Sequence, residues 1–101
     1  MAGIAALDRE ALARACERHG VARLRLFGSA VTSAFDARTS DLDFLVDFRP
    51  EAGRGITPFL ALQQDLEKIT GRPVDLVEAS AVRNPYFARQ AFSEAVDLYA
   101  R

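Results

Sequence analysis

Residues 26–29 (LFGS) and residues 40–46 (SDLDFLV), which begin eleven positions after Ser29, carry the strongest information about the fold. They predict a strand, a glycine-serine turn and a second strand that opens with two acids, Asp41 and Asp43. Alternate side chains of a strand point to the same face about 6–7 Å apart, so these carboxylates can converge on one point. Carboxylates for a divalent cation beside backbone donors for a phosphate indicate a nucleotide-handling site.

Size and composition predict one small domain that spans residues 1–101. Half of the residues are hydrophobic, 27% are charged and the formal net charge is −1, whereas a general nucleic-acid binder usually carries a basic excess. The single cysteine, Cys16, excludes an internal disulfide and is typical of a reducing compartment. No apolar stretch approaches the roughly 20 residues that span a bilayer. We therefore expect a cytoplasmic protein with no membrane contact.

Hydrophobic patterning predicts helices and strands in alternation. The expected helices cover residues 9–19, 30–35 and 58–70, and a last helix opens at Asn84-Pro85 with an apolar stripe that reaches Tyr99; the expected strands cover residues 21–27, 42–48 and 72–77. This order favours an α/β (α+β) fold with a small mixed sheet of about three strands. Each strand has one fully apolar face, so we expect the helices to pack on one face and the other face to stay open.

A third acid, Asp75, is expected on the open face beside Asp43. An isolated Asp-x-Asp pair is more often solvated than catalytic, but like charges gathered on one sheet face repel each other unless a cation is present. Nucleotidyl transfer is commonly assisted by two divalent cations that clamp the attacking and leaving oxygens. We predict that Asp41 and Asp43 bridge these ions and that Asp75 is a third ligand or a general base. Asp47 shares the face near the strand end, where solvent exposure is a sufficient explanation.

Gly28 and Ser29 are the predicted phosphate-binding half of the site. Glycine lets the backbone approach a phosphate closely. Ser29 is expected to begin a short helix, whose free N–H groups and positive dipole end favour an anion. Its hydroxyl would add one more donor to the outer phosphates.

These motifs resemble the signature of the DNA polymerase β-like nucleotidyltransferase superfamily. Within it, residues 26–29 and 40–46 are most similar to the minimal nucleotidyltransferases, often called MntA-type antitoxins. Residues 72–77 look like the strand that carries the family's third carboxylate, and residues 81–87 with 98–99 look like its C-terminal helix. The resemblance covers most of the chain.

The resemblance implies a nucleotidyltransferase fold and an enzyme that uses Mg²⁺, with two ions, and ATP. It places Asp41, Asp43 and Asp75 on the metal and Gly28 and Ser29 on the phosphates. It also implies a partner, a HEPN-domain toxin, which members of the family silence by transferring AMP to a tyrosine hydroxyl or by binding.

Two alternatives to protein modification remain open. Many members carry an arginine shortly after the Gly-Ser pair, whereas residues 31–33 are Val-Thr-Ser here, and Arg38, Arg49 or Arg54 would have to supply that charge from loops. The same fold could therefore neutralise its partner by binding alone, with little or no transfer. Modification of a small molecule is the other alternative, and the absence of an added substrate domain counts against it.

The C-terminal part is rich in aromatic residues for so small a domain: Tyr86, Phe87, Phe92 and Tyr99. Large exposed apolar patches tend to be interfaces, so these residues predict either a homo- or hetero-oligomer or a helix that covers the sheet. The sequence does not separate the two.

Overall fold

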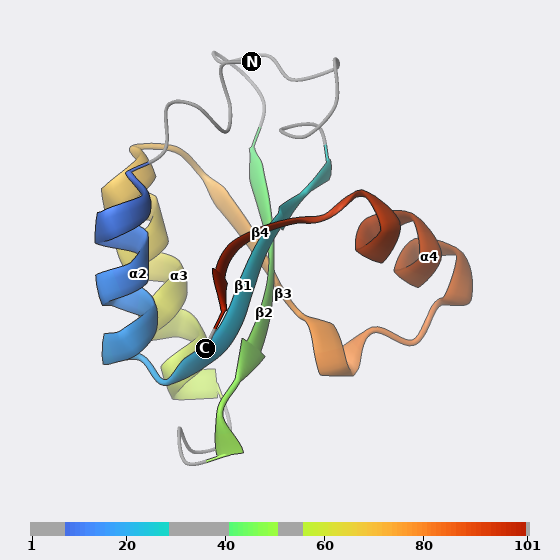
Figure 1. Ribbon diagram of the computed structural model, residues 1–101, viewed down its shortest axis with the longest axis horizontal. Coiled ribbons are helices and arrows are strands. Elements are labelled where there is room, and N and C mark those ends of the chain that lie inside the picture. The colour runs from blue at the N-terminus through green and yellow to red at the C-terminus, as the bar shows by residue number, and fades with distance from the viewer. Residues whose placement is uncertain (1–7, 29–40, 51–55, 101) are drawn as a thin grey trace.

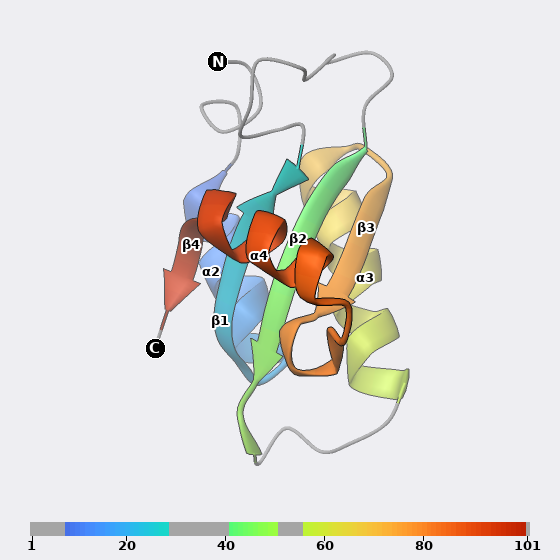
Figure 2. The same cartoon turned by 90° about the vertical axis from the view of Figure 1, so that its right-hand side faces the viewer.

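The computed structural model describes residues 8–28, 41–50 and 56–100, which form a four-stranded mixed sheet with helices on both faces (Figures 1 and 2). The strands lie in the order β3-β2-β1-β4. Their bounds are Val21–Phe27 for β1, Leu42–Phe48 for β2, Val74–Glu78 for β3 and Val96–Ala100 for β4. The central strand β1 pairs antiparallel with β2 and with β4, and β2 pairs parallel with β3. The predicted fold class is confirmed, with one strand more than the three expected.

Two helices pack on one face of the sheet and a third lies across the other. Figure 1 shows α2 (Arg9–Arg18) and α3 (Ile56–Thr70) side by side on the first face. A short 3₁₀ turn, η3 (Ala79–Ala81), leads from β3 to α4 (Pro85–Glu94), which crosses the opposite face (Figure 2). The expectation that helices cover a single face was therefore wrong. The helix expected at residues 30–35 lies outside the described residues.

Apolar side chains divide between these two faces as their positions along each strand dictate. The larger core lies between the sheet and the helices α2 and α3, and it includes Leu12, Cys16, Leu24, Phe44 and Leu62. Burial raises the pKa of the Cys16 thiol to about 12, so this cysteine is a small core residue rather than a nucleophile. None of the helices in the described part of the chain is long and apolar enough to cross a membrane.

The smaller core explains why α4 covers the second face. Phe27 and Leu45 are apolar residues on the face that also carries the acids, and both are buried against Ala91 of α4. Leaving these two side chains in water would cost about 1.5–3 kcal/mol each. The isolated Leu45 among the acids was the sequence signal that this face needed partial cover.

The last strand, β4, corrects the prediction that the final helix continues to Tyr99. The helix ends at Glu94, and Ala95 already has an extended backbone with φ −66° and ψ 142°. Residues 96–99 then alternate, with Leu98 buried and Asp97 exposed. Pairing with β1 satisfies a row of backbone donors and acceptors that would otherwise form an open sheet edge. Helical spacing of apolar residues was thus outweighed by this tertiary pairing.

Helices α2 and α3 are joined at one carboxylate. Asp65 of α3 accepts a hydrogen bond from Arg18 at 2.7 Å and another from His19, at the end of α2. Only 21% of the Asp65 side-chain surface is exposed, and the bond from His19 is partly shielded from water, whereas the bond from Arg18 is exposed. The hydrogen bond from His19 is the main reason that the pKa of Asp65 lies below its usual value.

We expect Asp65→Asn to lower the free energy of unfolding at pH 7 by about 1 kcal/mol, the upper range for such pairs. Because the pKa of Asp65 is lower in the folded state, its stabilisation is present above the unfolded pKa and is lost as the pH falls through the folded value. Urea unfolding at pH 7 and pH 3 measures this effect. Glu10→Gln, which removes the exposed pair between Glu10 and Arg14, is the control and should change stability by less than about 0.5 kcal/mol. An equal loss for Asp65→Asn at both pH values would contradict the assignment.

Candidate active site

The candidate site lies at the end of the sheet where β1 finishes and β2 begins. Phe27, the last residue of β1, is paired with Asp43 of β2, and Gly28 follows with a positive φ of 76°. A Cβ placed on Gly28 would lie 3.1 Å from Cγ of Asp43 and closer still to its Oδ2. The carboxylate of Asp43 therefore occupies the space that a side chain at position 28 would need. Gly28 is required here both for its backbone conformation and for this contact.

Asp75 lies beside Asp43 on the neighbouring strand. The two residues are register partners in the parallel pair of β2 and β3, so their side chains point to the same face. Neighbouring strands are about 4.8 Å apart, which brings the two carboxylates within reach of a common ligand. Asp75 is exposed at the outer strand of the sheet, whereas Asp43 is half-buried between Gly28 and Asp75. The expectation that Asp75 lies on the same face as Asp43, on a neighbouring strand, agrees with this register.

Two further residues were predicted for the site, Asp41 and Ser29. Asp41 is exposed and directly precedes β2. The next residue is tied to β3, because the backbone N–H of Leu42 donates to the carbonyl of Pro73 at 3.1 Å. Asp41 thus lies at the same end of the sheet as Asp43 and Asp75. Ser29 lies outside the described residues.

The electrostatics of the site centre on Asp43. Its pKa is raised, first because burial disfavours the charged carboxylate, and then because of the negative charges of Asp75 and Asp41. The negative charges of Asp75 and Asp41 therefore add to burial in disfavouring ionisation of Asp43. A bound cation would reverse this effect, since it favours the charged form of each acid.

The chemistry of these donors fits Mg²⁺. All are carboxylate oxygens, and Mg²⁺ is usually held by one or two carboxylates, several waters and the phosphates of its substrate rather than by a protein cage. Among residues 8–28, 41–50 and 56–100, no three acidic, histidine or cysteine side chains are gathered closely enough to hold a metal ion by themselves. Asp43 and Asp75, on adjacent strands, could hold such an ion together with Asp41, which directly precedes β2.

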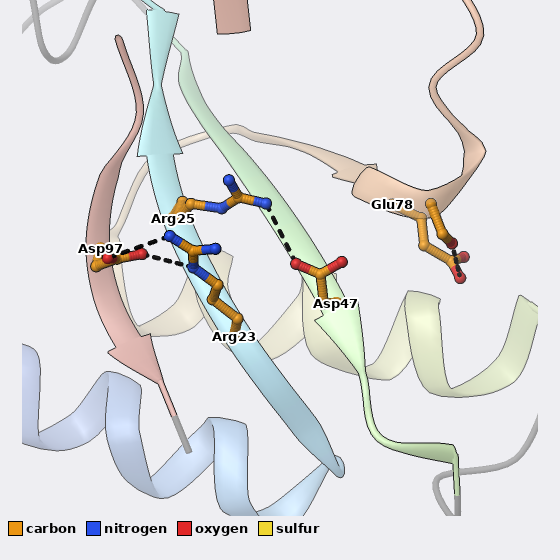
Figure 3. A network of polar contacts seen from close by, with 6 residues as sticks. Arg23, Arg25, Asp47, Glu78 and Asp97 are labelled. Atoms are coloured by element: carbon orange, nitrogen blue, oxygen red, sulfur yellow. Dashed lines mark hydrogen bonds and ion pairs between the residues drawn. The ribbon is translucent and has the colours of Figure 1, made fainter. Parts of the chain in front are cut away.

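Farther along the same face, the acids are paired with arginines. Figure 3 shows Arg25 of β1 reaching Asp47 of β2, and Arg23 bonded to Asp97 of β4. The guanidinium of Arg25 donates to Asp47 at 3.3 Å, and that of Arg23 donates to Asp97 at 2.8 Å. The guanidinium of Arg25 also lies over the ring of Phe92, 5.2 Å from its centroid. Asp47 therefore has a structural partner, which explains its presence on this face better than exposure alone.

Arg49 does not supply the missing charge near the phosphates. It follows β2, about 25 Å along the strand from Asp41 at 3.3 Å per residue. Its guanidinium donates to the carbonyl of Glu17, and its backbone N–H donates to the carbonyl of Gly20. Arg38 and Arg54, the other two candidates, lie outside the described residues.

A cavity adjoins the site on the side of α4, and no sequence pattern indicated it in advance. It has a volume of about 180 Å³ and is lined by Phe27, Gly28, Phe87, Gln90, Ala91 and Glu94. Phe27 and Phe87 meet edge to face with centroids 5.8 Å apart. The cavity exists because α4 crosses the face of the sheet that carries the acids. No local pattern in residues 85–94 predicted this crossing.

The chain belongs to the nucleotidyltransferase domain family, because the model of that family matches residues 8–98. A protein of Methanocaldococcus jannaschii, named as a proposed protein adenylyltransferase, is 32% identical over 81 residues, which are 80% of this chain and 83% of that protein. The prediction of a nucleotidyltransferase enzyme related to the minimal nucleotidyltransferases is thus confirmed.

Solved structures show the same fold. The chain is similar to a proposed minimal nucleotidyltransferase, with a TM-score of 0.72, 36% identity and coverage of 87% of this chain and 86% of that one. A toxin-antitoxin structure with AMP-PNP gives a TM-score of 0.73 at 18% identity, covering 94% and 75%. A complex of the tri-AMPylated Shewanella oneidensis HEPN toxin with its MNT antitoxin gives 0.65 at 17% identity, covering 92% and 70%. The last two likenesses, at 18% and 17% identity, establish the fold alone.

Proposed function

We propose that this protein transfers AMP from ATP to a hydroxyl group of a partner protein, with Mg²⁺ as cofactor, and that the partner is a HEPN-type toxin modified on tyrosine. The protein would then be the antitoxin of a toxin-antitoxin pair in the cytoplasm. The observation that carries this proposal is the placement of Asp43, which lies in register with Asp75 and directly against Gly28.

The arrangement of the acids favours an enzyme over a protein that acts only by binding its partner. Pure binding does not require neighbouring carboxylates that raise the pKa of Asp43, because a carboxylate whose ionised form is disfavoured destabilises the folded protein at neutral pH. A nucleotidyltransferase needs those carboxylates to hold its metal beside the phosphates. The names of the relatives point the same way, since one is named as a proposed protein adenylyltransferase and a structural neighbour is a complex with an AMPylated HEPN toxin.

In this proposal Asp41, Asp43 and Asp75 hold the metal, and Gly28 and Ser29 bind the outer phosphates through backbone and hydroxyl donors. Bound Mg²⁺ would neutralise phosphate charge and polarise the α-phosphate. The acceptor oxygen forms a bond to the α-phosphorus while the bond to the pyrophosphate oxygen breaks. Asp75 is the group that can accept the hydroxyl proton, because it is exposed on the outer strand where an acceptor can approach.

The test is to incubate the protein with α-labelled ATP, Mg²⁺ and the product of the adjacent gene, which we expect to be a HEPN-type protein. We expect label on the partner, loss of label in excess chelator, and loss of label when the acceptor tyrosine is changed to phenylalanine. Asp75→Asn should reduce the rate by about 10²-fold or more, a typical loss when one group that stabilises transition-state charge is removed.

Binding without transfer is the outcome that would refute the enzyme. If the partner is held tightly and silenced, carries no label, and is held equally well by Asp75→Asn, the protein acts by occupancy. The exposed aromatic residues of α4, with Tyr86 at 84% and Phe92 at 40% exposure, would then be the first surface to examine.

A further inference from the structure

The cavity between α4 and the end of β1 has the size and lining of a site for one aromatic ring system. A cavity of about 150 Å³ is large enough to hold benzene, and this one measures about 180 Å³ and opens beside Gly28. Its floor is apolar, because Phe27 and Ala91 are buried there. The ring of Phe87, 39% exposed, stands edge-on to Phe27 and forms a wall. An aromatic ligand would cover apolar surface that water now contacts.

The polar residues that line the cavity come from one face of α4. Gln90 and Glu94 are four positions apart, so their side chains project to the same side of the helix. An ionised glutamate only accepts hydrogen bonds, whereas a glutamine amide both donates and accepts. Neither side chain is hydrogen-bonded to another residue in the described part of the chain, although the backbone carbonyl of Gln90 accepts a bond from Ser93.

We infer that this cavity binds the purine ring of the nucleotide substrate, with Glu94 accepting from the exocyclic amino group and Gln90 bonding a neighbouring ring nitrogen. Glutamine pairs with adenine through its amino group and ring nitrogen, and carboxylates accept from exocyclic base amines. The position next to Gly28 supports this choice, because a base must lie near the phosphates to which its ribose is attached. The inference rests on the proposed function and deepens it by naming the residues that select the nucleotide.

The other aromatic group that could enter is the ring of the acceptor tyrosine. Asp75, the acid on the acceptor's side in the proposed reaction, lies on β3, whereas the cavity adjoins β1 on the opposite side of Asp43. A tyrosine there would be separated from Asp75 by the half-buried Asp43. The arrangement therefore favours the base over the acceptor.

The test compares two nucleotides that differ in one group. Calorimetry with Mg²⁺ and no acceptor measures the binding of ATP and of purine riboside triphosphate, which lacks only the exocyclic amino group. We expect ATP to bind the wild-type protein about tenfold more tightly, in line with a hydrogen bond to a charged group. Glu94→Ala should reduce this ratio to about twofold or less, whereas Glu17→Ala, which changes an exposed glutamate on α2, should leave it unchanged.

A second variant tests the cavity itself. Ala91→Leu fills the space under the proposed ring and should weaken both nucleotides, with the melting temperature as a check that the variant is folded. An unchanged ATP preference in Glu94→Ala would overturn the inference even if AMP transfer is observed. Normal nucleotide binding by Ala91→Leu with impaired partner modification would also overturn it and assign the cavity to the acceptor. A tenfold preference that depends on Glu94, in a protein that transfers nothing, would uphold the inference and refute the proposed transfer.

Discussion

Asp43→Asn is expected to abolish AMP transfer and, in the absence of metal, to make the protein more stable. The transfer rate should fall by at least about 10²-fold, because the substitution removes the charge of a proposed metal ligand, which lies between Gly28 and Asp75. The gain in stability follows from the raised pKa of Asp43, which shows that its ionised form is disfavoured in the folded state. An uncharged amide of the same shape avoids both the burial of charge and the repulsion from Asp75 and Asp41.

The pH dependence has a definite sign. Because the pKa of Asp43 is higher in the folded state than in the unfolded chain, the contribution of Asp43 to stability is most favourable below the unfolded pKa and is lost as the pH rises through the folded value. The melting temperature of Asp43→Asn should therefore exceed that of the wild type at pH 7 in chelator, and the difference should shrink towards pH 4. Adding Mg²⁺ with ATP should reverse the order, since a ligand that binds only the folded wild type stabilises it.

Asp47→Asn is the matched control, because it makes the same change four residues along the same strand face. Asp47 is paired with Arg25, whose side chain is only 12% exposed, so losing this partner should lower stability at pH 7. Transfer should be close to normal. If Asp43→Asn and Asp47→Asn both lowered stability in chelator, the like-charge repulsion inferred at Asp43 would be incorrect.

Gly28→Ala is expected to cost both stability and activity, through two separable effects. A non-glycine residue at a positive φ costs about 1–2 kcal/mol. In addition, the new methyl group would displace the Asp43 carboxylate, whose Cγ and Cβ lie 3.1 and 3.3 Å from the built Cβ. Because positioning errors of about 1 Å can cost 10²-fold in rate, transfer should fall by about that factor.

Gly71→Ala is the control that separates backbone strain at a positive φ from displacement of the Asp43 carboxylate. Gly71 has a similar φ of 67°, but a Cβ there meets nothing within 4 Å. It should lose about 1 kcal/mol and retain full transfer activity, as measured by urea unfolding and label incorporation. In an Asp43→Ala background the cost of Gly28→Ala should approach that of Gly71→Ala, because the carboxylate is no longer there. Equal effects of Gly28→Ala with and without the Asp43 carboxylate would show that the two residues do not interact.

Much of the sheet could be predicted from local pattern. Residues 21–27 and 42–48 alternate strongly enough to define both strands and their buried faces, and the predicted boundaries are those observed. Asp43 and Asp75 were placed on one face because the period of a strand is two. The starts of the first and last helices were also predicted, and in the structure the side chains of Asp8 and Asn84 accept hydrogen bonds from the first turn of each helix.

Other features were beyond local pattern because they depend on pairing between distant segments. Residues 96–100 satisfy helical spacing and strand alternation equally well, and the free edge of β1 selected the strand. The crossing of α4 over the acidic face depends on Phe27 and Leu45, which lie far from it in the sequence.

The amino-acid sequence by itself determined three of the four strands, β1, β2 and β3, and the acids that face one way, since these follow from the two-residue period of each strand. The tertiary structure alone decided that Asp43 fills the space beside Gly28, that Asp75 is its register partner, and that α4 closes a cavity against the end of β1. Such contacts join segments that lie far apart in the chain, where no local rule relates one to another. They arise only when the strands pair in one register and the remaining apolar surface is covered.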